Sequence, residues 1–162
     1  METTLFSPAY DRVFTKGDNT DLVATDTQKN TVYIVAKRTD ASTPEAFGVA
    51  LCEHLLKEYP ILSGCRADVE SVEWARACVD GRNGAQPHVH GFLRSEPERQ
   101  KGSFSMTRGQ GPKVESSIEG FVVLMTTQSG FEGYLKDKYT LLPDTQERCM
   151  ATEMPASWNY AQ

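Results

Sequence analysis

The chain has 162 residues, of which 39% are hydrophobic and 24% are charged, and this is the composition of an ordinary globular protein. Its net charge of −5 and the absence of a long basic run argue against a nucleic-acid partner. No stretch approaches the ~20 apolar residues that a membrane helix needs. We therefore expect a single domain over residues 1–162, with no nucleic-acid and no membrane partner.

The first segment, residues 2–14, has apolar residues in a loosely extended pattern that Pro8 interrupts. Proline cannot donate to a strand ladder, so this pattern predicts an edge strand or an imperfect strand. A polar run over residues 17–31 follows, and it surrounds one short apolar step, Leu22-Val23-Ala24. We expect this step to be buried and to deliver Thr25 and Asp26 to a fixed place.

Residues 26–38 fit two structures. The β-rich run at residues 31–35 favours a strand, whereas Val32, Val35 and Ala36 fall at helical spacing. Thr25 or Asp26 would cap the helix if a helix forms. The residues alone favour neither alternative.

The next helix has clear signals at both ends. Thr43 is a good capping residue, Pro44 suits the first helical position, and Glu45 suits the positive end of a helix. An apolar face continues to about residue 58, where Tyr59-Pro60 ends the helix.

The second half of the chain is dominated by strand signals. Residues 66–79 alternate with a parity switch that predicts a bulge near Ser71. The remaining expectations are turns at 82–84 and 109–112, a strand at 87–94, a strand covered on both faces at 121–125, a short helix at 132–142 and an irregular last strand at 147–160. The order predicts an α+β fold with helices on one face of an antiparallel sheet.

Several residue types that often carry chemistry are better explained by structure. The cysteines form no C-x-x-C pair, so we expect reduced structural thiols at Cys52, Cys65, Cys78 and Cys149. His88 and His90 would share one face of a strand, where both could ligate a metal. Further ligands are few, so we expect structural histidines and no metal. The glycine clusters match no phosphate-binding loop, and we expect no nucleotide cofactor.

A different set of residues suits a flat anionic ligand. Phe131 offers a stacking face, and Arg148 offers a planar fork of five donors. Thr25 and Asp26 add a hydroxyl, a carboxylate and backbone N–H groups. Together these groups could grip an electron-rich heterocycle at its face and at its edge.

Motifs along nearly the whole chain resemble the uricase (urate oxidase) family. They are Asp18-Asn19-Thr20-Asp21-Leu22-Val23-Ala24-Thr25-Asp26-Thr27-Gln28-Lys29-Asn30-Thr31-Val32-Tyr33, Pro87-His88-Val89-His90-Gly91-Phe92, Thr127-Gln128-Ser129-Gly130-Phe131-Glu132-Gly133, Asp137-x-Tyr139-Thr140-Leu141-Leu142-Pro143, Glu147-Arg148-Cys149-Met150-Ala151-Thr152 and Trp158-Asn159-Tyr160.

The resemblance implies a T-fold (tunnelling fold), an antiparallel sheet backed by two helices, which associates into barrels in a homotetramer. It implies purine catabolism, in which urate, O2 and water give 5-hydroxyisourate and hydrogen peroxide without a metal or an organic cofactor. It also implies a peroxisomal location in a eukaryote, although the family's targeting tripeptide is absent from this chain, and a cytoplasmic location otherwise.

The resemblance assigns roles to four residues. Thr25 is implied to be the catalytic hydroxyl, and the backbone of Thr25 and Asp26 to bind the purine edge. Phe131 is implied to stack on the ring, and Arg148 to clamp its carbonyl and nitrogen edge. In the family these groups meet across a subunit interface.

The chain also departs from the family pattern. The family has an earlier strand with a catalytic lysine and a second T-fold domain, and neither is found in this sequence. We therefore expect a uricase truncated at both ends. The alternatives are a non-catalytic fragment that binds purines or only assembles with other chains, and another T-fold enzyme that acts on pterins or purines with zinc.

Overall fold

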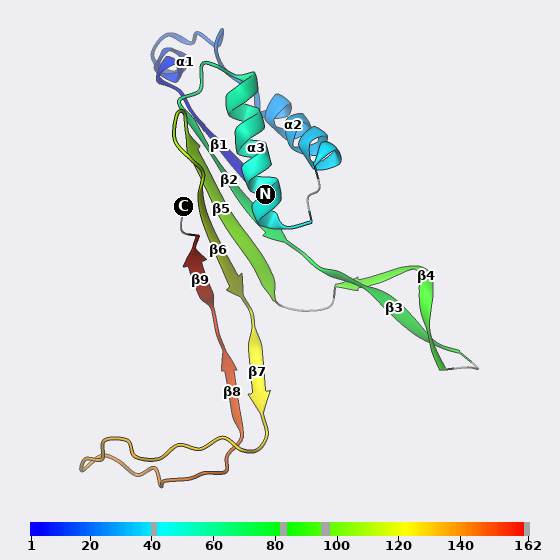
Figure 1. Cartoon of the computed structure of the whole chain (residues 1–162), viewed down its shortest axis with the longest axis vertical. Helices are drawn as coiled ribbons and strands as arrows, with labels where there is room; N and C mark the ends of the chain where they lie inside the picture. The colour runs from blue at the N-terminus through cyan, green and yellow to red at the C-terminus, as the bar shows by residue number, and fades with distance from the viewer. Residues whose placement is uncertain (40–41, 82–83, 95–97, 161–162) are drawn as a thin grey trace.

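The computed structural model describes residues 1–39, 42–81, 84–94 and 98–160 (Figure 1). In chain order the elements are β1 (Glu2–Phe6), the 3-10 turn η1 (Pro8–Tyr10), α1 (Asp11–Lys16), α2 (Thr25–Arg38), α3 (Pro44–Glu58), β2 (Gly64–Ser71), β3 (Trp74–Gly81), β4 (Gly84–Arg94), β5 (Arg99–Thr107), β6 (Lys113–Glu119), β7 (Val122–Met125), β8 (Met150–Glu153) and β9 (Ala156–Asn159). The turn expected at 82–84 falls mainly on residues 82 and 83, outside the described residues.

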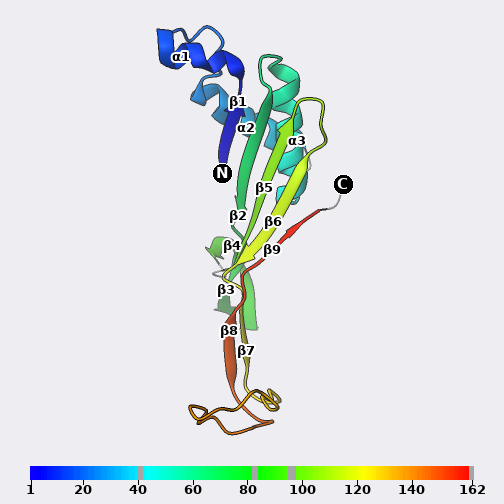
Figure 2. The same ribbon diagram turned by 90° about the vertical axis from the view of Figure 1, so that its left-hand side faces the viewer.

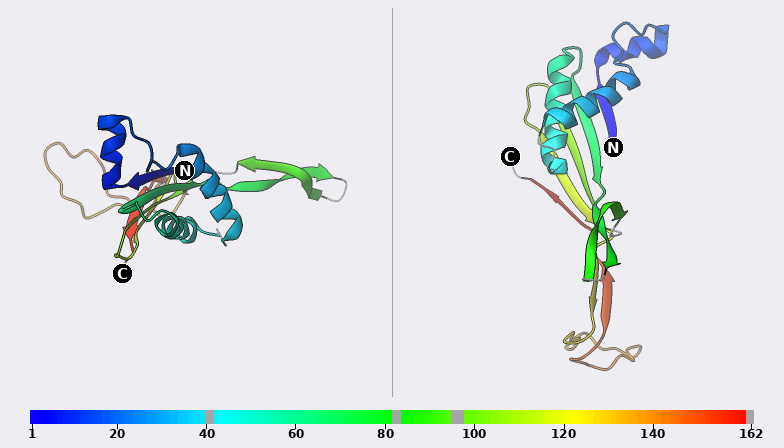
Figure 3. Two further views of the ribbon diagram at one scale, coloured as in Figure 1. Left: turned by 90° about the horizontal axis from the view of Figure 1, so that it is seen from above. Right: turned by 90° about the vertical axis from the view of Figure 1, so that its right-hand side faces the viewer.

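The main sheet has five strands in the order β1-β2-β5-β6-β9, and every neighbouring pair is antiparallel. Helices α2 and α3 cover one face of this sheet, and α3 lies directly over β2 and β5 (Figures 1 and 3). The predicted α+β fold with two helices on one face is therefore confirmed. None of the helices within the described ranges is long and apolar enough to cross a membrane.

The hydrophobic core lies between α3 and the sheet. Leu51 and Leu55 of α3 pack on alternate residues of β2, Cys65 and Ala67, and on Phe104 of β5, all of them at most 1% exposed. Burial of each large apolar side chain stabilises the fold by about 1.5–3 kcal/mol. The odd-numbered residues of β2 therefore face the helices, as the period of two requires.

Glycines allow α3 to approach the sheet closely over Phe104. A Cβ atom on Gly48 of α3 would lie 2.0 Å from Cδ2 of Phe104, and one on Gly102 of β5 would lie 2.2 Å from its Cζ. Phe104 thus fills the space that two missing side chains leave. The packing depends on glycine at both positions.

Residues 26–38, which the sequence left undecided, are helical. Thr31 and Val35 are buried and Val32 is half-buried against the core, which is the spacing of one helix face. Packing against α3 therefore outweighs the β propensity of residues 31–35 and makes the segment helical. The helix begins one residue earlier than expected, and its N-cap is Ala24, which gives no side-chain hydrogen bond. The prediction that Thr25 or Asp26 caps the helix is therefore wrong.

The helix over residues 44–58 is confirmed with its cap. The hydroxyl of Thr43 accepts from the backbone N–H of Ala46 at 3.1 Å, Pro44 is the first helical residue, and Tyr59 follows the last. The N-terminal segment is partly as expected. β1 is an edge strand, but the chain turns helical after Ser7, because Pro8 begins η1 and the Ser7 hydroxyl accepts from the backbone N–H of Ala9 at 3.2 Å.

Two ribbons of two strands each extend away from the five-stranded sheet (Figures 1 and 2). β3 pairs with β4, and β7 pairs with β8. Within the described range 42–81, the bulge predicted near Ser71 is absent. The alternation of apolar residues changes there because β2 ends at Ser71 and β3, the first strand of the β3–β4 ribbon, begins at Trp74. The register shift within this ribbon lies between Arg76 and Cys78.

The prediction that residues 121–125 are covered on both faces is wrong in the isolated chain. Val122 is 58% exposed and Leu124 is 66% exposed, because β7 pairs only with β8 within the described residues. The helix expected at 132–142 is also absent. Residues 126–149 form a long irregular loop between β7 and β8, and residues 147–160 contain two strands rather than one.

Candidate functional site

Thr25 and Asp26 lie at the start of α2, and both are exposed. Of the apolar step before them only Val23 is buried, at 8% exposure, whereas Leu22 is 42% exposed. The expected buried segment is therefore a single anchoring residue. This one side chain fixes the chain immediately before the helix.

The first turn of α2 keeps backbone donors available. The N–H of Gln28 makes the first intrahelical bond, to the carbonyl of Ala24, so the three preceding N–H groups have no intrahelical acceptor. Asp26 accepts from the side-chain amide of Asn30 at 3.0 Å, which holds its carboxylate along the helix. A helix start with open donors attracts a negatively charged or carbonyl-rich ligand.

Gln28 ties this helix start to the edge strand. Its Nε2 donates to the carbonyl of Val23 at 3.2 Å, and its Oε1 accepts from the hydroxyl of Thr3 at 2.9 Å. A hollow of about 440 Å³ opens beside these groups, lined by Met1, Thr3, Thr25, Gln28, Lys29, Val32 and Tyr33. Thr25 therefore faces space that a small molecule can enter.

Phe131 and Arg148 come together in the loop over residues 126–149. The guanidinium carbon of Arg148 lies 5.0 Å from the centre of the Phe131 ring, a cation–π contact. Antiparallel bonds between Phe131 and Thr145 hold the two arms of the loop together, at 2.7 and 3.2 Å. The structure thus brings two of the four predicted site residues into one place.

Arg148 retains binding capacity. Its Nε donates to the hydroxyl of Ser129 at 3.3 Å, and its Nη2 contacts the sulfur of Met150 at 3.8 Å. Among the ion pairs of the described residues none includes Arg148. The remaining N–H groups of its fork can therefore meet the edge of an anionic ligand.

The two halves of the predicted site are separated within one chain. Helix α2 lies beside α3 at one end of the molecule, and the loop that follows β7 lies at the other end, beyond the second ribbon (Figure 1). Thr25 and Asp26 are therefore not brought to Phe131 and Arg148 in the single chain. The resemblance implies a site shared between subunits, and a single chain does not test that arrangement.

Tyr134 lies in the same loop as Phe131 and Arg148, and no sequence pattern pointed to it. Its ring stacks on Phe131 with centroids 4.6 Å apart and planes 12° apart, and its hydroxyl donates to the carbonyl of Leu142. The helix expected at 132–142 begins after Phe131, so it gave no indication that the two rings stack. Gly133, at φ 72°, gives the turn that places the rings against each other.

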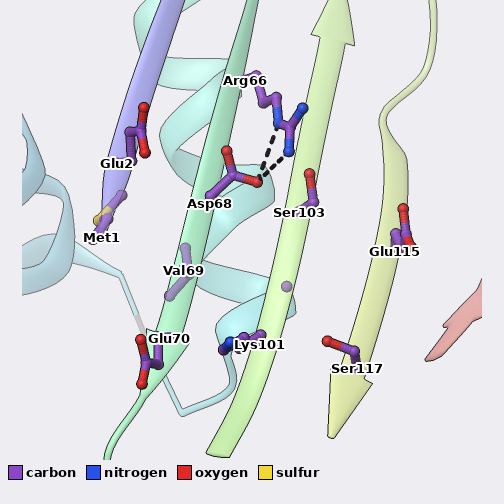
Figure 4. Close-up of a pocket in the computed structure, with 11 residues that line it drawn as sticks. Met1, Glu2, Arg66, Asp68, Val69, Glu70, Lys101, Ser103, Glu115 and Ser117 are labelled. Atoms are coloured by element: carbon purple, nitrogen blue, oxygen red, sulfur yellow. Dashed lines mark hydrogen bonds and ion pairs between the residues drawn. The ribbon is translucent and has the colours of Figure 1, made fainter. Parts of the chain in front are cut away.

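A second hollow, of about 460 Å³, lies on the face of the sheet away from the helices, and Figure 4 shows the residues that line it. It is lined by charged and polar side chains of β1, β2, β5 and β6, namely Glu2, Arg66, Asp68, Glu70, Lys101, Ser103, Glu115 and Ser117, together with Met1, Val69 and Gly102. Arg66 donates to Asp68 at 2.8 and 3.1 Å. None of the four predicted site residues lines this hollow.

The histidines and cysteines show no catalytic arrangement. The Nδ1 of His88 accepts from the backbone N–H of His90 at 3.2 Å, and the described residues contain no group of three metal-ligating side chains. All four cysteines are free thiols, with Cys52 and Cys65 buried and the other two exposed. The hydrogen bond with Cys65, together with burial, raises the pKa of Cys52 and keeps its thiol protonated.

These features define the class of the protein: an α+β domain in which a loop presents an aromatic ring and a guanidinium together. A family model described as Uricase matches residues 3–105 and 114–162. The chain is 42% identical over 159 residues to Uricase-2 of Phaseolus vulgaris, covering 98% of this chain and 50% of that one. It is 36% identical over 147 residues to Uricase of Aspergillus flavus, covering 91% of this chain and 47% of that one.

Solved structures agree with the sequence comparison. The crystal structure of uricase from Arthrobacter globiformis superposes with a TM-score of 0.72 at 34% identity, covering 99% of this chain and 53% of that one. The chain therefore belongs to the uricase family, and its fold is the T-fold. It spans about half the length of the curated relatives that it matches.

Proposed function

We propose that copies of this chain assemble into a urate oxidase. Urate, O2 and water would be converted to 5-hydroxyisourate and hydrogen peroxide, so that urate loses two electrons and O2 gains them. The observation that carries this proposal is the pairing of Arg148 with Phe131 in a loop where the guanidinium has no carboxylate partner among the described residues. Family membership adds the reaction to this geometry.

Each of the four residues has a physical role in the proposal. Phe131 stacks on the flat purine, and Arg148 donates to its carbonyl and nitrogen edge. The open backbone N–H groups of Thr25 and Asp26, at the start of α2, bind a second edge, and the Thr25 hydroxyl relays a proton there. A urate anion held flat in this way is itself the reductant, so the protein has to remove a proton and position O2 above the ring.

The assembly is proposed to be a homo-oligomer, a tetramer as the resemblance implies, in which residues 1–162 form one T-fold domain. Thr25 of one copy would meet Phe131 and Arg148 of another. The separation of the two halves within one chain supports this arrangement. So do the apolar side chains that the two ribbons expose, among them Trp74 at 63%, Leu93 at 61% and Leu124 at 66%. A peroxisomal location in a eukaryote, or a cytoplasmic one otherwise, is part of the same proposal.

The test is a direct assay of the purified chain with urate in air and no added metal. Loss of the urate absorbance band with equimolar release of hydrogen peroxide supports the proposal. Absence of both, at a chain concentration where the oligomer forms, contradicts it. The oligomeric state is measured in the same buffer by light scattering, so that a dissociated sample is recognised.

A second candidate function is a purine-binding or assembly module without turnover. The observation that favours it is again the separation of Thr25 from Phe131 and Arg148, because one chain alone presents only half-sites. Urate binding without peroxide release would establish this second function. Binding is measured without O2, and turnover is then measured on the same sample after O2 is admitted.

A further inference from the structure

Tyr134 is half-buried in a loop whose other large side chains are mostly exposed. Leu135 is 93% exposed and Leu141 is 94% exposed, whereas Tyr134 lies parallel to Phe131 with ring centroids 4.6 Å apart. A nearly parallel pair at this distance is a stacked aromatic contact. One ring of this loop is therefore held by another ring.

Contacts with both arms of the loop hold Tyr134 itself. Its hydroxyl donates to the carbonyl of Leu142, and the ammonium of Lys136 lies 5.3 Å from its ring centre. Lys136 in turn forms an ion pair with Asp144. Tyr134 cannot rotate away from Phe131 without breaking these contacts.

The stacking limits which face of the Phe131 ring a ligand can contact. An aromatic ring has two faces: Tyr134 covers one of them, and the guanidinium of Arg148 lies over the ring, 5.0 Å from its centre. A flat ligand can therefore stack only on the face toward Arg148, once the guanidinium has moved to the edge of that ligand. Phe131 is still 39% exposed, which leaves surface for such a ligand. Because the Phe131 ring is already ordered, ligand binding does not have to include the entropic cost of ordering that ring.

We propose that Tyr134 is a positioning residue of the urate site. It holds the Phe131 ring in the plane on which the purine stacks, and it determines which face the purine uses. This inference rests on the proposed function, because it assigns a role within the same site. Tyr134 acts through Phe131 and does not itself touch the purine.

A purely structural role would use a different part of the side chain. If Tyr134 only fixed the shape of the loop, the hydroxyl bond to Leu142 would carry the effect. Tyr134→Phe removes that bond and keeps the ring, whereas Tyr134→Leu removes the ring as well. The chain also offers a matched control, because Tyr139 lies in the same loop beneath Lys138 but is 77% exposed and makes no ring contact with Phe131.

The experiment is a urate titration of the purified chain without O2, followed by steady-state kinetics in air. Tyr134→Leu is expected to weaken urate binding roughly three- to tenfold, which corresponds to the loss of a stacked pair. Tyr134→Phe and Tyr139→Leu are expected to stay within about twofold of the parent chain. In steady-state kinetics Tyr134→Leu should raise KM and leave kcat nearly unchanged. An ordered stacking face binds the ground state and the transition state alike, so its loss affects binding more than the chemical step.

Two results would overturn the inference while leaving the proposed function intact. In the first, Tyr134→Leu binds urate as tightly as the parent chain. In the second, Tyr134→Phe loses as much affinity as Tyr134→Leu, which assigns the effect to the hydroxyl and the loop shape. If the parent chain itself binds no urate, the proposed function fails together with the inference. Amide exchange at Phe131 and Thr145 checks that the backbone bridge survives in each variant.

Discussion

The guanidinium of Arg148 lies over the ring of Phe131, with its central carbon 5.0 Å from the ring centre. The two residues come from opposite arms of an irregular loop, which the bridge between Phe131 and Thr145 closes. An aromatic ring and a donor fork therefore lie together in one loop.

Arg148→Ala is expected to weaken urate binding by about 2–4 kcal/mol, because the edge of a bound anion would lose its charged partner. Arg148→Lys keeps the charge but loses the planar fork, so it should recover only part of this loss. Urate titration without O2 measures both variants. Unchanged affinity in Arg148→Ala would remove this residue from the site.

A capping residue at the start of α2 should stabilise the fold and weaken urate binding at the same time. Ala24 is the N-cap and gives no side-chain bond, so Ala24→Asp is expected to raise the free energy of unfolding by about 1 kcal/mol. The new carboxylate would occupy N–H groups that the proposal assigns to the purine edge, so urate binding should weaken at the same time. Ala24→Gly is the control, since it adds no acceptor. A cap that stabilises the chain without affecting urate would show that these N–H groups do not bind it.

Gly48 should not tolerate even a methyl group. A Cβ there would lie 2.0 Å from the buried Phe104 ring, and we expect Gly48→Ala to lower the free energy of unfolding by about 1–3 kcal/mol despite the better helix propensity of alanine. Glu53→Ala, at an exposed position of the same helix, should change it by less than about 0.5 kcal/mol. Denaturant unfolding measures both. A neutral Gly48→Ala would mean that α3 does not pack this closely on the sheet.

The four thiols should divide into two classes. A thiol reagent is expected to modify Cys78 and Cys149 in the folded chain and to reach Cys52 and Cys65 only after unfolding. The raised pKa of Cys52 also has a consequence for stability. Its thiol stays protonated in the folded chain but ionises near 9 in the unfolded chain, so stability should fall as the pH rises above about 9.

The matched variant for this pH dependence is Cys52→Ala, which should lose part of the alkaline decrease in stability. Unfolding curves at pH 7 and pH 10 give the comparison. Equal decreases in the parent chain and in Cys52→Ala would assign the alkaline loss to other groups.

The sequence predicted the elements whose signals are local. Thr43-Pro44 specified the start of α3, and Gly109 to Pro112 specified the turn between β5 and β6, where the N–H of Gln110 bonds to the carbonyl of Thr107. It failed where conformation depends on distant contacts. Packing of α2 on α3 decided the undecided segment, and the closure of residues 126–149 by the Phe131–Thr145 bridge excluded the expected helix.

The site was predicted in the same uneven way. The side-chain chemistry of Phe131 and Arg148 predicted that they act on one ligand, and the structure places the two residues together. Tyr134 was missed because its role depends on the path of an irregular loop, which no periodic pattern reveals. In the proposed assembly Thr25 would meet this pair in a second copy of the chain, and the fold of one copy does not specify that contact.

The most direct test of the shared site mixes two variants, Thr25→Ala and Arg148→Ala, each expected to be nearly inactive alone. If Thr25 of one copy serves Arg148 of another, random assembly restores about a quarter of the sites, because each intact half is supplied by one variant half of the time. Urate consumption and peroxide release should then recover to about a quarter of the parent value after the mixture is dissociated and reassembled. A mixture that stays as inactive as its two components would contradict the account.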